Sequence, residues 1–247
     1  EFGLRGAWRL DLRVLRRLHR LSLPIAIQYF MEMGGITLFF ALIARLGDAE
    51  MAATNAVIQT WSVAFMGAVA LSAGATTLAG QCVGAQRPED GRIAVHRILR
   101  LGYVYCAILA VGYVLVPDQL MGLFVRGDDL ERLLPLAKPL FLIVVVCLVF
   151  DLIFHTLSGA LRGAGDTRFA MVVTVANTWL VFVPALLIAT PRFGLFGAWS
   201  CLVLDVLILS SLMWLRFRSS AWESPPLHEE DDDLEADPAT EERLEAA

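Results

Sequence analysis

The feature that most constrains this chain is a series of six apolar stretches, each long enough to cross a bilayer. The hydrocarbon core of a membrane is about 30 Å thick, which a helix of about 20 residues spans. Lipid offers the backbone no hydrogen-bond partners, so such stretches fold as helices. A hydrophobic fraction of 57% over 247 residues is typical of a membrane protein. The predicted spans are 23–44, 52–81, 98–116, 133–161, 169–189 and 194–215.

The formal net charge of -5 conceals an uneven distribution along the chain. Eleven of the 25 acidic residues follow Trp222, and without that tail the chain carries a net charge of +5. Residues 219–247 combine few apolar side chains with high charge, so we predict a disordered acidic tail, with binding to a partner as the alternative. Residues 1–20 are basic, with leucines at helical spacing, and predict an amphipathic helix on the membrane surface. Residues 21–218 form the membrane bundle, and beside six spans we expect no nucleic-acid partner.

The distribution of arginine predicts the orientation in the membrane. If the N-terminus, the loops after spans two and four and the segment after span six share one side, that side holds 14 basic residues. The opposite side holds four arginines. The positive-inside rule then places both termini in the cytoplasm.

Three carboxylates interrupt the apolar spans at a similar depth. Glu32 lies twelve residues from Arg20, Asp151 eleven from Arg162 and Asp205 eleven from Arg216. At the rise of an α-helix each lies about 17 Å from the inner boundary, close to the bilayer midplane. A charge at that depth is costly and is by default a functional-site hypothesis. We therefore predict a shared polar chamber, in which Glu32 and Asp151 form the cation or proton site and Asp205 is a candidate supporting residue.

Other polar side chains recur at helical spacing near these acids. They can ligate a cation through oxygen or pass a proton, and they can equally join helices by hydrogen bonds. For the histidine, a satisfied core position is as good an interpretation as a relay. The candidate supporting residues are Gln28, Asn55, Gln59, His155 and Asn177.

The sequence offers no pattern that predicts an enzyme. Asp151, His155 and Ser158 lie along one helix, where a nucleophile, a base and an orienting group rarely converge. The RGAGDT segment lacks the spacing of a phosphate loop and fits a tight turn. The four cysteines have no metal-ligand spacing and are predicted to be buried small hydrophobes. We expect no cofactor and no resident metal, apart from a coupling ion.

Three segments resemble the multidrug and toxic compound extrusion (MATE) family: LPIAIQYFMEMGG, LSAGATTLAGQCVGAQRPEDGR and FDLIFHTLSGALRGAGDTR. The resemblance covers nearly the whole chain except the acidic tail. It implies an all-α membrane protein that is the second six-helix lobe of a twelve-helix transporter. It also implies that Glu32 and Asp151 are the cation-binding carboxylates of the lobe. Some members carry a tyrosine one turn before this aspartate, where Cys147 stands here, so both H⁺ and Na⁺ remain candidates for the coupling ion.

The resemblance implies efflux of amphipathic or cationic compounds by cation-coupled antiport across a bacterial inner membrane. The chain starts at Glu1 rather than at methionine, and we expect a fragment whose N-terminal lobe is missing. Two alternatives stay open. A flippase for lipid-linked saccharides would need arginines in the chamber, and no span has one at its middle. In a membrane scaffold that transports nothing, the acids would be structural.

Overall fold

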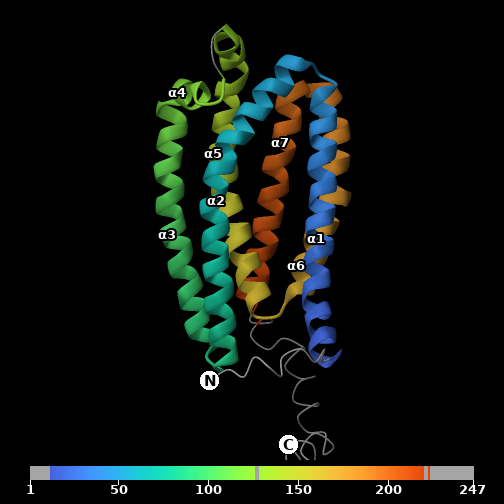
Figure 1. Cartoon of the computed structure of the whole chain (residues 1–247), viewed down its shortest axis with the longest axis vertical. Helices are drawn as coiled ribbons and strands as arrows, with labels where there is room; N and C mark the ends of the chain where they lie inside the picture. The colour runs from blue at the N-terminus through green and yellow to red at the C-terminus, as the bar shows by residue number, and fades with distance from the viewer. Residues whose placement is uncertain (1–11, 126–127, 220–221, 223–247) are drawn as a thin grey trace, which may run out of the picture.

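The computed structural model describes residues 12–125, 128–219 and 222. The long helices run side by side along one axis (Figure 1), and these described residues contain no strand. The elements are α1 Leu12–Ala44, α2 Asp48–Gly84, α3 Pro88–Leu115, α4 Pro117–Gly122, α5 Asp128–Gly163, α6 Thr167–Asn177, the π-helix η2 Thr178–Phe182 and α7 Val183–Arg218.

Five continuous helical stretches are long and apolar enough to cross a membrane, and the last of them, Thr167–Arg218, makes two crossings. A straight helix of these 52 residues would be about 78 Å long, more than twice the thickness of the hydrocarbon core. The chain instead reverses at Gly194, whose φ of 62° and ψ of -143° are not helical. Consequently Gly197 lies against Ala189, and a Cβ on Gly197 would be 2.7 Å from the Ala189 carbonyl oxygen. The prediction of an all-α bundle with six crossings is confirmed.

The ends of the helices follow from the local sequence. α3 begins with Pro88 in its first turn, where the missing N–H costs no hydrogen bond. Glu89 and Asp90 follow in the same turn and interact favourably with the helix dipole. α3 therefore starts ten residues before the predicted span, because its charged first turns are helical as well. Gly165 adopts a φ of 96° between α5 and α6, as a tight turn requires.

α5 is the central helix of the bundle. It packs against α2, α3 and α7, and 56% of its apolar window is buried, compared with 22–33% in the other candidate spans. Small residues bring α2 and α5 into backbone contact: a Cβ on Gly80 would lie 2.8 Å from the Gly163 carbonyl oxygen. Lys138 on α5 pairs with Asp118 on α4 at 2.9 Å near the opposite end.

Ordered structure continues across the predicted segment boundaries at both ends of the bundle. Residues 12–20, predicted to belong to a separate surface helix, continue without a break into the first span, and the helix passes through Pro24. Residues 1–11 lie outside the described part of the chain. So does the predicted acidic tail, except Ser219 and Trp222. The Trp222 side chain is fully buried and stacks on Phe217, with ring centroids 5.0 Å apart, so packing extends beyond the predicted limit at residue 218.

Candidate functional site

A polar layer divides the apolar interior of the bundle into two cores. On α7, Cys201 belongs to the core nearer Gly194, termed the outer core, and Leu209 to the core nearer Arg216, termed the inner core, with Asp205 between them. On α6 and the segment after it, Asn177 lies between Ala170 of the inner core and Phe182 of the outer core. Asp151 occupies the same level on α5, where Leu152 is the last member of the outer core and Phe154 the first of the inner core. The sequence estimate of a common depth therefore agrees with the packing.

On α1, the side chain of Gln28 forms hydrogen bonds with Glu32 and with α6. The Gln28 side chain is 2% exposed, and its Nε2 donates to Glu32 Oε1 at 3.1 Å and to Thr174 Oγ1 of α6 at 3.3 Å. Glu32 itself is half-buried. The glycines that follow it permit this packing, because a Cβ on Gly35 would lie 2.7 Å from Thr178 Cγ2.

On α7, Asp205 accepts a hydrogen bond from the side-chain amide of Asn177 on α6. Asn177 Nδ2 donates to Asp205 Oδ1 at 2.6 Å and also approaches the Asp205 backbone oxygen at 3.4 Å. Asn177 is 4% exposed and is the last residue of α6 before the π-helix. Single π-helical turns occur frequently at functional sites.

Asp151 is the most buried of the three acids, with 5% of its side chain exposed. Trp61 of α2 lies beside it, and Trp61 Nε1 and Asp151 Oδ2 are both buried without a hydrogen bond of regular geometry in the described part of the chain. Asp205 is within electrostatic range of both Asp151 and Glu32. Hydrogen bonds join Gln28 to Glu32 and Asn177 to Asp205, and the electrostatic interactions of Asp205 bring the three acids into one region.

Two predicted supporting residues do not join this region. Asn55 and Gln59 point from an exposed face of α2, and neither forms a hydrogen bond with the acids. The buried residues of α2 are mostly alanine and valine while these polar side chains are exposed, so the polar spacing alone does not reveal which face of the helix packs against the bundle. Thr174, by contrast, was not predicted; it lies one turn before Asn177 on α6, and that spacing was the available signal.

His155 lies between aromatic rings rather than beside a proton acceptor. Its ring centroid is 4.8 Å from both Phe65 and Phe154, and its backbone oxygen accepts a hydrogen bond from Ser72 at 2.7 Å. Ser158 Oγ has no partner among the described residues. No chain of hydrogen bonds connects Asp151, His155 and Ser158, so the geometry of a nucleophilic triad is not formed there.

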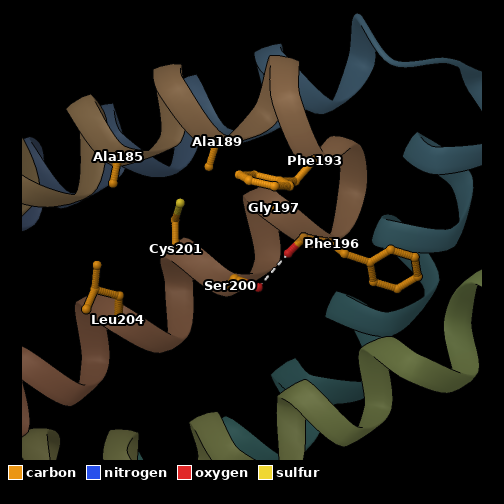
Figure 2. A pocket seen from close by; sticks show the side chains of 8 residues that line it. All are labelled: Ala185, Ala189, Phe193, Phe196, Gly197, Ser200, Cys201 and Leu204. Carbon is orange, nitrogen blue, oxygen red and sulfur yellow. Dashed lines mark hydrogen bonds between the residues drawn. The ribbon is translucent and has the colours of Figure 1, made fainter.

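A pocket of about 540 Å³ lies between the two arms that meet at Gly194 (Figure 2). The hydroxyl of its one serine, Ser200, donates to the Phe196 backbone oxygen at 2.7 Å, so the remaining lining is apolar and offers a cation no charged ligand. The lining residues are Ala185, Ala189, Phe193, Phe196, Gly197, Ser200, Cys201 and Leu204.

The polar layer offers carboxylate and amide oxygens as ligands. In the described ranges, no three His, Cys, Asp or Glu side chains are close enough to hold a metal together. The cysteines are free; Cys106, Cys147 and Cys201 are buried, whereas Cys82 is half-buried, contrary to the prediction for it.

The fold and this layer define a class: a helical membrane lobe with six crossings and ionisable groups at mid-depth, as in secondary transporters. The family model MatE matches residues 24–187, and the chain belongs to that family. The family resemblance drawn from the sequence is thereby confirmed.

Relatives and solved structures agree with this assignment. The chain is 28% identical over 210 residues to the probable multidrug resistance protein NorM of Thermotoga maritima, covering 83% of this chain and 44% of that protein. It is 32% identical over 200 residues to the probable NorM of Pseudomonas aeruginosa, covering 79% and 41%. The crystal structure of the eukaryotic MATE transporter AtDTX14 superposes with a TM-score of 0.76 at 17% identity, covering 87% and 49%. The chain thus spans about half the length of these relatives.

Proposed function

We propose that the protein containing this chain exports amphipathic or cationic small molecules by cation-coupled antiport, with Glu32 and Asp151 binding the coupling ion. Membership of the MatE family supports efflux, and the names of the relatives support multidrug substrates. The observation that carries the site is Asp151: an almost fully buried carboxylate whose Oδ2 forms no hydrogen bond of regular geometry within the described chain, with the indole N–H of Trp61 beside it.

The burial of Asp151 gives the coupling its physical basis. A buried carboxylate without a partner costs several kcal/mol, and binding of H⁺ or Na⁺ relieves that cost. Each positive charge that enters the cell gains about 2.3 kcal/mol per 100 mV of membrane potential. That energy drives export if the cation and the drug favour states that face opposite sides, since a ligand shifts an equilibrium only by its differential affinity.

This mechanism agrees with the finding that the chain spans only about half the length of its relatives. In transporters built from repeats, the substrate site lies near the midplane between two lobes that rock against each other. α1 presents a partly exposed Glu32 beside the exposed side chains of Tyr29, Phe30 and Met33, so the half-buried carboxylate borders a surface that a second lobe would cover. The ends of the bundle that carry Arg87, Arg162 and Arg216 would face the cytoplasm of the inner membrane.

The test replaces each acid by its neutral isostere in the complete protein. We expect Glu32→Gln and Asp151→Asn to abolish dye efflux from cells while insertion into the membrane stays at the wild-type level, since an amide cannot load a proton or neutralise Na⁺. Asp118→Asn is the matched control, because this acid lies in an exposed ion pair at the end of the bundle. Wild-type efflux by both variants would refute the site.

A second measurement separates a transporter from a scaffold. Addition of a cationic dye to the purified complete protein should release protons or displace Na⁺ when drug and cation favour opposite states. A scaffold whose acids are structural would bind no dye and release neither ion. That result would refute the proposed function.

A further inference from the structure

The side chains of Trp61 and Asp151 leave a hydrogen-bond donor and an acceptor buried beside each other. Trp61 Nε1 and Asp151 Oδ2 each expose less than 1 Å² of surface, and neither has a hydrogen bond of regular geometry in the described part of the chain. An indole nitrogen can only donate, whereas a carboxylate oxygen accepts. A buried polar atom without a partner costs about 1–3 kcal/mol, so each of these two atoms is the partner that the other lacks.

The register of α2 against α5 places Trp61 at the level of Asp151. Contacts between the two helices advance along both chains together, so α2 and α5 run in the same direction. These contacts are Phe65 with His155, Ser72 with Gly159 and Thr76 with Gly163. Trp61 is one turn before Phe65, and Asp151 is one turn before His155, whose ring centroid is 4.8 Å from that of Phe65. Residues one turn apart share a helix face, so Trp61 lies opposite Asp151, in agreement with the interaction between their side chains.

Packing against the outer core fixes the Trp61 ring. Its centroid is 6.4 Å from that of Trp199 on α7, and the two ring planes are tilted by 44°. Trp199 is held in turn, because it is fully buried and its Nε1 donates to Thr54 Oγ1 at 3.4 Å. The indole of Trp61 therefore presents its N–H to α5 from a defined position.

We propose that Trp61 is the positioning residue of the coupling-ion site: its indole N–H holds Asp151 Oδ2 and so directs Asp151 Oδ1 toward the coupling cation. This inference rests on the proposed function. For a proton, Oδ1 carries the hydrogen while Oδ2 accepts from the indole; for Na⁺, Oδ1 ligates the ion and Oδ2 again accepts from the indole. Hydrogen bonds at functional sites are often poorly aligned before the ligand binds and tighten afterwards, which accounts for the irregular geometry of the pair.

The competing explanation is that Trp61 only fills space beside the outer core. Trp61→Phe separates the two, because phenylalanine keeps an aromatic ring against Trp199 and removes the N–H. Trp214→Phe is the matched control. Trp214 is also a half-buried tryptophan packed against an apolar core, and its ring centroid is 6.0 Å from that of His96, but it lies against the inner core near Arg216.

The first measurement is efflux of a cationic dye by the complete protein in proteoliposomes, over a series of Na⁺ concentrations at constant pH and, separately, over a series of proton gradients at constant Na⁺. Dye binding without a gradient is recorded on the same samples. Loss of a group that orients a ligating carboxylate weakens cation binding, so we expect Trp61→Phe to raise the concentration of the driving cation at half-maximal efflux by about tenfold while dye binding changes less than about twofold. Trp214→Phe should equal the wild type in both.

The second measurement follows the indole itself and keeps the inference testable if Trp61→Phe does not fold. The complete protein is labelled with 5-fluorotryptophan and observed by ¹⁹F NMR while the driving cation is added. We expect one resonance to shift in the wild type and to stay unshifted in Asp151→Asn, because the cation then has no carboxylate to bind beside Trp61. That resonance should be absent from the spectrum of Trp61→Phe and present in that of Trp214→Phe.

The outcomes separate this inference from the function on which it rests. If the wild type shows efflux but Trp61→Phe has the same half-saturating cation concentration, whatever its maximal rate, the positioning role is refuted and the proposed function stands. An equal rise in Trp214→Phe would also refute it, in favour of a general effect of packing. A protein that shows efflux without a cation-dependent tryptophan resonance that needs Asp151 refutes it as well. If the wild type shows no gradient-driven efflux, the proposed function fails and the positioning role fails with it.

Discussion

The backbone contact between α2 and α5 predicts that a single methyl group at Gly163 will destabilise the bundle. A Cβ at this position would overlap the carbonyl oxygen of Thr76 and lie 2.8 Å from its carbonyl carbon and 2.9 Å from its Cα. Real Cβ atoms essentially never come within 3.0 Å of another heavy atom. These atoms belong to the backbone of α2, so no side-chain rotation relieves the overlap and the two helices must separate.

The change in stability caused by Gly163→Ala is the sum of two opposing effects. Overpacking of a tight interior costs about 1–3 kcal/mol, whereas alanine favours a helix over glycine by at most about 1 kcal/mol. At the end of α5 we expect the cost of separation to dominate, because α5 packs against α2, α3 and α7 along the bundle and also contacts α4 and α6. Gly163→Ala should therefore lower the midpoint of thermal unfolding by several degrees.

The assay is thermal unfolding of the purified protein in detergent, followed by size-exclusion chromatography with fluorescence detection. Gly112→Ala is the matched control: Gly112 is also near the end of a helix, α3, but a Cβ there meets nothing within 4 Å. It should leave the midpoint unchanged or raise it slightly. Equal midpoints for Gly163→Ala and Gly112→Ala would refute the claim that backbone contact fixes α2 against α5.

Two further predictions concern the end of the bundle that carries Arg87 and Arg216. Cys82 is the one half-buried cysteine, so a membrane-impermeant maleimide should label it first, and only from the cytoplasmic side; labelling from the outer side in intact cells would overturn the proposed orientation. Trp222 is fully buried, stacks on Phe217 and donates from Nε1 to its backbone oxygen at 2.8 Å. Trp222→Ala should therefore cost about 3–5 kcal/mol of stability, and an unfolding midpoint equal to that of the wild type would show that this packing contributes nothing.

The level of the acids along the helices could be predicted from the sequence. A residue's height in a membrane helix is fixed by its count from the charged end, because the rise per residue is constant. Counting from Arg162 and Arg216 placed Asp151 and Asp205 at one level, and in the structure both lie between the two apolar cores. Gln28 was predicted to share a face with Glu32 from their spacing, and the two are hydrogen-bonded.

The rotation of each helix about its own axis could not be predicted in the same way. Asn55 and Gln59 satisfied the same spacing rule as Gln28, yet they lie on an exposed face of α2. In a soluble protein, polar and apolar faces would reveal this orientation. In a membrane, lipid and protein interior are equally apolar, so a buried face and a lipid-facing one carry similar residues.

The sequence by itself determined that this chain crosses a bilayer six times, because length and apolarity suffice to specify a transmembrane helix. It also predicted three acids at one level of the bundle, and Asp151 and Asp205 lie between the two apolar cores. Only the tertiary structure decided which polar side chains contact one another. Asn177 reaches Asp205 because α6 and α7 are packed side by side after the reversal at Gly194. That contact joins residues 28 positions apart, and it depends on interhelical packing rather than on hydrophobicity.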